Sequence, residues 1–157
     1  MQLQIAYYLE RSCKLRSAGT QKADFGGQTR DHAFAFSING KGYIGAGLDG
    51  STTKKDFWEY DPATNNWTQK ADFPGDARRA ATGFAIGNYG YLGLGWDGTN
   101  YFVDFYEYSP GNNSWIQIAN FGGAGIARPV GFELNGKGYA GTGISSAGIK
   151  QLWIMKQ

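Results

Sequence analysis

The 157 residues suffice for one domain with a sizeable core, and 25 glycines, 16% aromatic residues and only four prolines favour short strands joined by tight turns. A formal charge of +2 gives no bulk electrostatic indication of nucleic-acid or membrane-surface binding, and the single cysteine, Cys13, excludes an internal disulfide framework and a zinc site of several thiolates. No segment approaches the run of about 18 apolar residues that spans a membrane as a helix, so we expect no membrane insertion.

Three repeats follow a divergent N-terminal segment of residues 1–19, and a constant period of 48 residues relates them. Many positions share this period without an insertion, so chance is a poor explanation. The repeated positions are Phe25, Phe73 and Phe121; Tyr43, Tyr91 and Tyr139; Gly47, Gly95 and Gly143; Trp67 and Trp115; Asp56 and Asp104; and the aromatic series Phe57, Phe105 and Trp153.

Within the first repeat the pattern predicts four antiparallel strands. Small and large side chains alternate over residues 33–38, and Asn39-Gly40 supplies a tight turn into a second strand over residues 42–47. A polar loop over residues 48–55 leads to a third strand over residues 57–60, and the turn that begins at Asp61-Pro62 precedes a fourth strand anchored by Trp67. Four such strands make one propeller blade. We therefore expect blades at about residues 20–70, 71–118 and 119–157, the last without its fourth strand.

The end of each complete repeat carries a known signature. The string Trp-Glu-Tyr-Asp-Pro-Ala-Thr-Asn-Asn-Trp, from Trp58 to Trp67, resembles the third-strand, turn and fourth-strand signature of kelch repeats, and so does the stretch from Tyr106 to Trp115. Three arginines resemble the one that precedes the first kelch strand, the third displaced by two residues: Arg30, Arg78 and Arg128. The resemblance implies an all-β fold of kelch-type β-propeller blades, each a four-stranded antiparallel sheet.

The glycine pair that follows the repeated tyrosine in kelch repeats is altered here. Its first position is Ala46, Leu94 or Thr142, with an additional glycine one residue earlier. This variant is similar to kelch modules of bacterial secreted proteins and to the central domain of galactose oxidase, which favours an extracytoplasmic compartment, although residues 1–9 lack the basic region of a signal peptide. The oxidase activity is not implied, because its copper site needs two histidines and His32 is the only one here.

Three blades form a partial ring, because closed propellers have about four to eight. Two explanations stay open. In the first, the chain is a fragment of a longer propeller. In the second, two chains associate as three plus three blades into a six-bladed ring, and the N-terminal residues of each chain supply the missing outer strand of the other's last blade.

Residues that keep the period are expected to serve packing, because large rings fill the space between blades and glycine lets backbones approach closely. These structural positions are Tyr43, Gly47, Trp67, Tyr91, Gly95, Trp115, Tyr139 and Gly143. A ligand site is therefore sought where the repeats differ.

The candidate ligand-binding residues are arginines near the first strands and an aromatic loop of the second repeat. A guanidinium group there can bind a carboxylate or phosphate, or form a structural ion pair. Aromatic loop residues can stack on sugar rings or peptide side chains, or pack onto the top of the blade. The candidates are Arg30, Arg78, Arg79, Trp96, Asn100, Tyr101 and Arg128.

Three other features are interpreted conservatively. His32 begins a first strand beside Asp31, but neighbours on a strand point to opposite faces, so we expect a structural or loop position rather than a catalytic pair. Cys13 has basic neighbours but no partner base, which indicates an incidental thiol. The Gly-x-Gly-x-x-Gly strings over residues 45–50 and 93–98 recur with the period and open no helix, so we interpret them as turns.

The sequence favours a non-catalytic interaction module whose variable loops bind a protein or a glycan, with no cofactor, no metal and no nucleic acid. The alternatives are a propeller enzyme that resembles the kelch-type sialic acid mutarotases and a vestigial structural half-propeller. An enzyme needs its chemical groups on particular blades, whereas most of the conspicuous residues here repeat in every blade.

Overall fold

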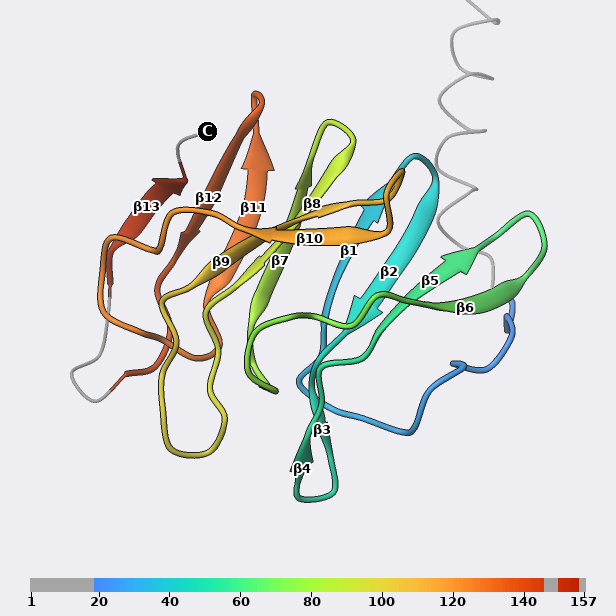
Figure 1. Cartoon of the computed structure of the whole chain (residues 1–157), viewed down its shortest axis with the longest axis horizontal. Coiled ribbons are helices and arrows are strands. Elements are labelled where there is room, and N and C mark those ends of the chain that lie inside the picture. Colours follow the sequence, from blue (N-terminus) through green and yellow to red (C-terminus); the bar gives the residue numbers. More distant parts are fainter. Residues whose placement is uncertain (1–18, 146–149, 156–157) are drawn as a thin grey trace, which may run out of the picture.

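The computed structural model describes residues 19–145 and 150–155, and every regular element in these residues is a β-strand. Three antiparallel sheets, one for each repeat, follow one another and fan out side by side (Figure 1). No helix in this part of the chain is long and apolar enough to cross a membrane. The N-terminal segment, apart from Gly19, lies outside the described residues, and so does Cys13.

Each sheet is a meander in which strands that are consecutive in the repeat pair with one another. Blade 1 consists of β1 (Phe34–Ile38), β2 (Lys41–Gly45), β5 (Phe57–Asp61) and β6 (Asn66–Lys70), with a small hairpin of β3 (Leu48–Asp49) and β4 (Thr52–Thr53) between β2 and β5. Blade 2 consists of β7 (Thr82–Ile86), β8 (Tyr89–Gly93), β9 (Phe105–Ser109) and β10 (Ser114–Gln117). Blade 3 contributes β11 (Val130–Leu134), β12 (Lys137–Gly141) and β13 (Leu152–Met155).

Backbone conformation sets the ends of the strands. Asn39 and Gly40 have φ angles of 50° and 78°, the left-handed pair that a tight hairpin turn requires, as predicted. The second strand ends at Gly45 and not at Gly47, because Ala46 and Gly47 have φ angles of 52° and 100° and leave the extended conformation. At Gly47 a Cβ atom would also lie 2.7 Å from the carbonyl oxygen of Asp31, so only glycine fits.

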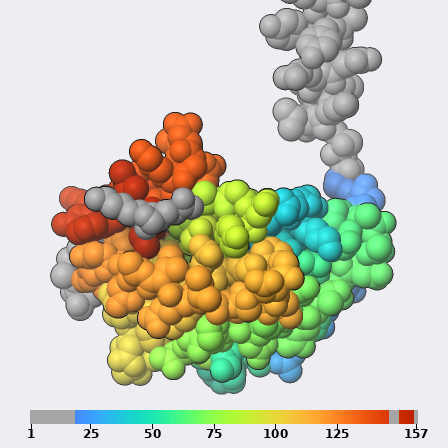
Figure 2. Space-filling view, turned by 45° about the horizontal axis from the view of Figure 1, so that its top comes forward, coloured from blue at the N-terminus to red at the C-terminus, as the bar shows by residue number. Residues whose placement is uncertain are grey.

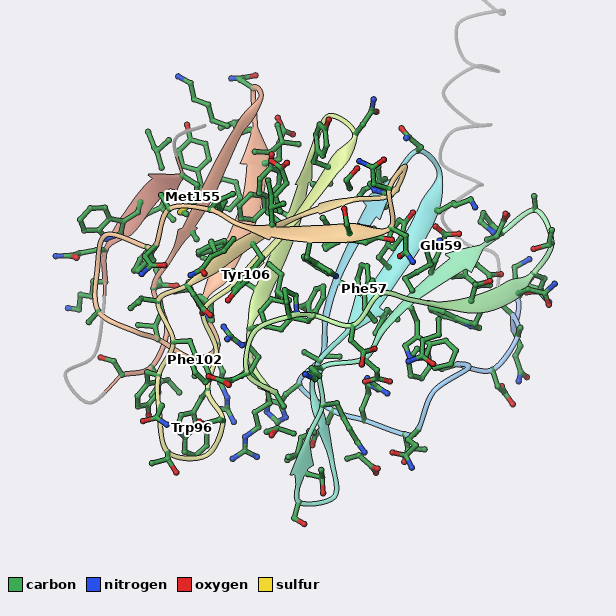
Figure 3. All side chains as sticks on the ribbon, viewed as in Figure 1. Phe57, Glu59, Trp96, Phe102, Tyr106 and Met155 are labelled. Atoms are coloured by element: carbon green, nitrogen blue, oxygen red, sulfur yellow. The ribbon has the colours of Figure 1, made fainter. Side chains whose placement is uncertain are left out.

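Aromatic rings fill the space between blades, as expected from the repeat. Phe57 of blade 1 lies 4.7 Å from Tyr108 and 4.9 Å from Trp115 of blade 2, measured between ring centroids (Figure 3 shows Phe57 between the two sheets). The rings press on glycines of the next sheet: a Cβ on Gly90 would lie 2.3 Å from Phe36. Each blade therefore presents bulky side chains to the blade that follows it and a glycine-bearing face to the blade before it.

The inner ends of the blades are joined by backbone hydrogen bonds. Ala80 N–H donates to the carbonyl oxygen of His32 at 2.9 Å, and Arg128 N–H donates to that of Ala80 at 2.8 Å. These three residues stand 48 apart and have φ angles of 52°, 53° and 54°, although none is glycine. These three left-handed residues thus join blade 1 to blade 2 and blade 2 to blade 3 through their backbones.

Blade 3 departs from the period of 48 residues. Tyr43 and Tyr91 lie opposite Glu59 and Glu107, but Tyr139 lies opposite Ile154, one residue earlier than the period requires. The expectation that Trp153 continues the series of Phe57 and Phe105 is therefore wrong, because the strand pairing puts Trp153 at a different position of the sheet. Trp153 occupies the place of Trp58, because the connection from β12 to β13 is one residue shorter. Phe121 accordingly meets Trp153 at 5.7 Å and 63°, as Phe25 meets Trp58 at 5.7 Å and 65°.

The far side of blade 3 is an apolar sheet surface, which we call the end face. Its members are each 40–52% exposed and are Val130, Phe132, Leu134, Leu152 and Ile154. The corresponding rings of blade 1, Phe34, Phe36 and Phe57, are packed against blade 2. The space-filling view shows the blades in succession, with blade 3 at the red end of the molecule (Figure 2).

Candidate functional site

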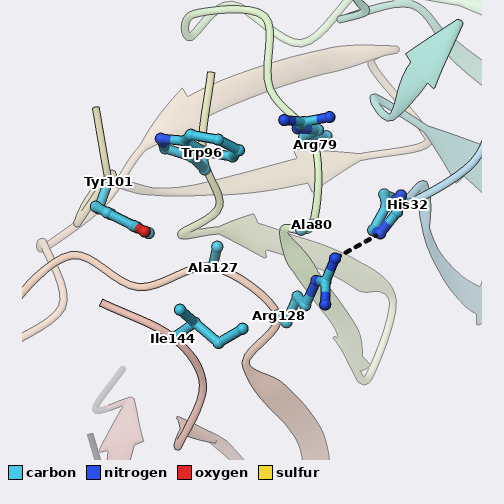
Figure 4. Close-up of a pocket in the computed structure, with 8 residues that line it drawn as sticks. All are labelled: His32, Arg79, Ala80, Trp96, Tyr101, Ala127, Arg128 and Ile144. Atoms are coloured by element: carbon cyan, nitrogen blue, oxygen red, sulfur yellow. Dashed lines mark hydrogen bonds between the residues drawn. The ribbon is translucent and has the colours of Figure 1, made fainter. Parts of the chain in front are cut away.

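A pocket of about 210 Å³ lies where the inner ends of the three blades converge. Its lining is His32, Arg79, Ala80, Trp96, Tyr101, Ala127, Arg128 and Ile144 (Figure 4). None of these side chains is acidic, and two of them are arginines. Four of the seven predicted ligand-binding residues therefore meet in one pocket. Among the described residues no group of His, Cys, Asp and Glu side chains is placed to hold a metal ion.

The left-handed residues supply the part of the lining that differs from blade to blade. His32, Ala80 and Arg128 have the same backbone conformation and the same place in each repeat. Their side chains are an imidazole, a methyl group and a guanidinium group. The repeat thus places three positions around one pocket, and the sequence makes their chemistry asymmetric.

His32 is held between Asp31 and Arg128. Asp31 Oδ1 lies 2.9 Å from His32 Nδ1, and Arg128 Nη2 lies 3.2 Å from His32 Nε2. Because a guanidinium nitrogen can only donate, Nε2 accepts and Nδ1 carries the proton that Asp31 accepts. The expectation that Asp31 and His32 point to opposite faces is wrong, because His32 has a φ of 52° and does not continue a strand.

Trp96 and Tyr101 form an aromatic wall on the long loop between β8 and β9 (Figure 3 shows Trp96 at the lower end of the blades). Their rings stack at 6.0 Å and 19° between planes. The Arg79 guanidinium carbon lies 4.5 Å from the centroid of the Trp96 ring, a cation–π contact. The Trp96 indole N–H is buried and has no acceptor within the described ranges, which leaves one donor unsatisfied.

Asp97 holds the conformation of this loop through hydrogen bonds, and Asn100 donates two of them. Asp97 accepts hydrogen bonds from the backbone N–H groups of Thr99 and Asn100 at 2.7 and 2.6 Å, and from the Asn100 side chain at 3.0 Å. The hydrogen bonds from Asn100, the backbone one first, lower the pKa of Asp97. Asn100 is therefore engaged in holding the loop, and it does not line the pocket.

Arg30 and Arg78 lie elsewhere, in two matching ion pairs. Arg30 donates to both carboxylate oxygens of Asp56 at 2.6 and 2.7 Å, and its guanidinium carbon lies 4.7 Å from the Phe25 ring. Arg78 binds both oxygens of Asp104 in the same way, and its side chain is fully buried. Both arginines are saturated by partners within their own blade, so neither faces the pocket.

Arg128 is not the third member of that series. Ile126, which is fully buried, takes the place of Arg30 and Arg78. Gln151 takes the place of the aspartates, since Thr142 N–H donates to its carbonyl oxygen at 2.8 Å as Ala46 N–H donates to that of Asp56. Blade 3 has thus lost both charges of the pair, and the displaced arginine at 128 points into the pocket instead.

A second carboxylate is buried in blade 1, away from the pocket. Glu59 accepts hydrogen bonds from the Tyr43 hydroxyl at 2.6 Å and from Lys41 Nζ at 2.9 Å. Burial opposes ionisation of Glu59, but these two hydrogen bonds outweigh it and hold its pKa below the usual value. Burial and the bond to Glu59 raise the pKa of Tyr43. This pair is part of the packing of the blade.

The radial series of antiparallel meanders, with a pocket at their inner ends, defines the chain as part of a β-propeller. No protein-family model matches the sequence, and no curated protein matches it either. The fold is similar to the solved structure of YjhT, a β-propeller, with a TM-score of 0.65 and 27% sequence identity. The matched region covers 79% of this chain and 37% of that one, so the chain spans less than half the length of YjhT.

Proposed function

We propose that the chain is a kelch-type interaction module that binds an acidic sugar, the terminal residue of a glycan, in the pocket at the inner ends of the blades. The observation that carries this proposal is the combination of stacked aromatic rings with two arginines and no acidic residue in one lining. It narrows the expectation of a protein or glycan partner to one ligand chemistry.

The aromatic wall supplies the sugar-binding part of the argument. The apolar C–H face of a sugar ring packs on an aromatic face, and Trp96 stacked on Tyr101 offers an extended rigid surface. The unsatisfied Trp96 N–H also favours binding of an oxygen-bearing ligand. A buried donor without a partner costs about 1–3 kcal/mol, and a ligand oxygen that accepted its hydrogen bond would remove that cost.

The two arginines of the pocket, Arg79 and Arg128, favour an acidic sugar over a neutral one. Arg128 is exposed, and within the described residues the one side-chain hydrogen-bond partner of its guanidinium is the imidazole of His32, so it retains donors for a carboxylate. Arg79 adds a second positive charge over the Trp96 ring. The pocket, about 210 Å³, is smaller than the 300 Å³ or so at which drug-sized sites begin, which suits one sugar residue.

Titration calorimetry with N-acetylneuraminic acid, glucuronic acid and glucose tests the proposal. Arg128→Gln is expected to weaken binding of the acidic sugars at least tenfold and to leave glucose unchanged, whereas Trp96→Leu weakens all three. Lys137→Gln removes an equal charge from an exposed hairpin and is the matched control. No binding of any sugar, or equal loss with Lys137→Gln, contradicts the proposal, and the structural half-propeller then becomes the better interpretation.

A second candidate is a propeller enzyme that resembles the kelch-type sialic acid mutarotases. It is favoured by the Asp31–His32 pair, which holds an unprotonated Nε2 at the rim of the pocket beside Arg128. With Arg128 turned to a ligand carboxylate, Nε2 can take the proton of the anomeric hydroxyl while the ring oxygen takes a proton from solvent as its bond to the anomeric carbon breaks. The reverse transfers follow when the ring closes on the other face of the carbonyl group. Exchange between anomers measured by NMR separates the two functions: His32→Gln abolishes catalysed exchange in an enzyme but alters only affinity in a binding module.

A further inference from the structure

A second cavity, of about 350 Å³, lies between blades 2 and 3 on the side of the outer strands, and we call it the outer slot. Its lining is mainly apolar and consists of Phe84, Ile86, Tyr91, Phe105, Glu107, Ile118, Ala119 and Met155. None of these residues belongs to the pocket at the inner ends of the blades. The outer slot is therefore a separate site.

The equivalent place between blades 1 and 2 is filled by a tryptophan. Trp115 lies 4.9 Å from Phe57 and 4.9 Å from Tyr108, measured between ring centroids. Phe105 of the outer slot stands 48 residues after Phe57, and Met155 takes the place of Tyr108 in the shifted register of blade 3. The side chains that surround Trp115 thus have counterparts around the outer slot. The slot therefore lies at the repeat position of a buried tryptophan and has an apolar lining that suits an indole ring.

Hydrogen bonding specifies the occupant further. Trp67 Nε1–H donates to the carbonyl oxygen of Ala23 at 3.2 Å, and Trp115 Nε1–H donates to that of Ala71 at 3.0 Å. The N–H groups of the same alanines donate to the side-chain oxygens of Asn65 and Asn113, at 3.0 and 2.9 Å. Each alanine is therefore clamped by an asparagine and a tryptophan that are two residues apart in sequence.

Ala119 is the third alanine of this series and lines the outer slot. Within the described residues its N–H and C=O groups have neither of the two partners that Ala23 and Ala71 have. A donor and an acceptor are thus available at the spacing that an Asn-x-Trp segment satisfies twice elsewhere in the molecule.

The neighbouring strand completes the site. In blades 1 and 2 the third strand pairs with a fourth, but β13 pairs only with β12 among the described strands. Within the described part of the chain its outer edge is therefore free, and it offers backbone donors and acceptors to an added strand, the mode of binding known as β-augmentation. Figure 1 shows β13 at the outer border of the third sheet.

We propose that the outer slot and the free edge of β13 bind an extended peptide segment with the pattern Asn-x-Trp. The segment adds antiparallel to β13 as a fourth strand and inserts its indole ring between Phe105 and Met155. The indole N–H donates to the Ala119 carbonyl oxygen, and the asparagine oxygen accepts from the Ala119 N–H. The site takes a peptide, and the pocket at the inner ends of the blades plays no part in it.

Fluorescence anisotropy of the labelled peptide Gly-Asn-Asn-Ser-Trp-Ile-Gln-Ile, the sequence of residues 111–118, tests the proposal on the full chain. Saturable binding is expected, at least tenfold weaker when the peptide tryptophan is replaced by alanine and weaker also when its second asparagine is replaced. Hydrogen exchange at Leu152 to Met155 should slow when the peptide is added.

Two protein variants make the test specific. Ile118→Trp fills the outer slot and is expected to weaken peptide binding at least tenfold, whereas Ile116→Trp, at a position in β10 that is 58% exposed, leaves it unchanged. Arg128→Gln also leaves it unchanged, so this site and the sugar pocket fail independently. No saturable binding overturns the proposal, and so does equal binding by the alanine peptide or by an Ile118→Trp variant with wild-type circular dichroism.

Discussion

Replacement of Arg78 by isoleucine tests how the buried ion pairs contribute to stability. The substitution leaves Asp104 as a carboxylate that is only 19% exposed and has lost both guanidinium contacts. Removing one partner of a buried pair costs about 3–5 kcal/mol, and the residual exposure of Asp104 places this case near the lower figure. For a domain of this size each kcal/mol lowers Tm by about 2–4 °C, so the expected decrease is about 6–12 °C.

Blade 3 supplies the matched control, because Ile126 and Gln151 stand where the other blades have arginine and aspartate. The double variant Arg78→Ile with Asp104→Gln copies this arrangement and leaves no uncompensated charge. It is expected to lie within about 1 kcal/mol of the wild type, since apolar replacement of a whole buried pair is often neutral. Urea unfolding at pH 7, followed by tryptophan fluorescence, measures both variants. A double variant as unstable as the single one would refute the reasoning.

Three further predictions concern packing, pH and the aromatic loop. Gly90→Ala places a Cβ 2.3 Å from Phe36 and should destabilise the fold by about 1–3 kcal/mol in thermal melts. Gly42→Ala, whose new Cβ has its nearest described neighbour at 3.9 Å, should be neutral, and equal effects of the two variants would contradict this. The folded-state pKa of Glu59 lies below its ordinary value of 4.5, so its ionised form stabilises the fold above that pH, and this stability is lost as pH falls through the folded pKa. Glu59→Gln should therefore flatten the decline of Tm on acidification. An unchanged decline would show that Glu59 does not contribute to the acid sensitivity of the fold. Asp97→Ala removes three hydrogen bonds from the loop, so it should speed chymotrypsin cleavage between residues 96 and 103 without a large change in Tm. An unchanged cleavage rate would show that the conformation of the loop does not depend on Asp97.

The sequence predicts the blades well, because one packing requirement recurs three times. Phe25 and Phe73 need the same ring contacts in each unit, so the period of 48 residues appears directly in the sequence. Register in blade 3 is hidden, since Trp153 is aromatic and suits either the series of Phe57 or that of Trp58. A deletion of one residue inside a loop changes no pattern, and only the pairing of β12 with β13 reveals it.

The candidate site is predictable in part. Trp96 and Tyr101 stand out because an aromatic loop is unusual, and the structure stacks them. Arg128 is a predicted ligand-binding residue that does line the pocket, but its assignment to the series of Arg30 and Arg78 is wrong, because Ile126 takes that place. The orientation of His32 is misjudged, because it lies at a left-handed position where strand alternation does not apply. The outer slot could not be predicted, since it requires the three-dimensional surroundings of Trp115.

The end face makes the two ends of the series of blades different from each other. Its ring at Phe132 is the counterpart of Phe36, which presses on Gly90 of the following blade. In blade 1, a Cβ built on Gly42 would have no atom of the described residues closer than 3.9 Å. The two ends therefore differ in shape, since one carries bulky apolar side chains and the other has a glycine with space above it. A contact between copies through these ends would be head to tail. A head-to-tail contact of this kind would close after two copies if each of six blades turned by roughly 60°, and would otherwise continue into a filament.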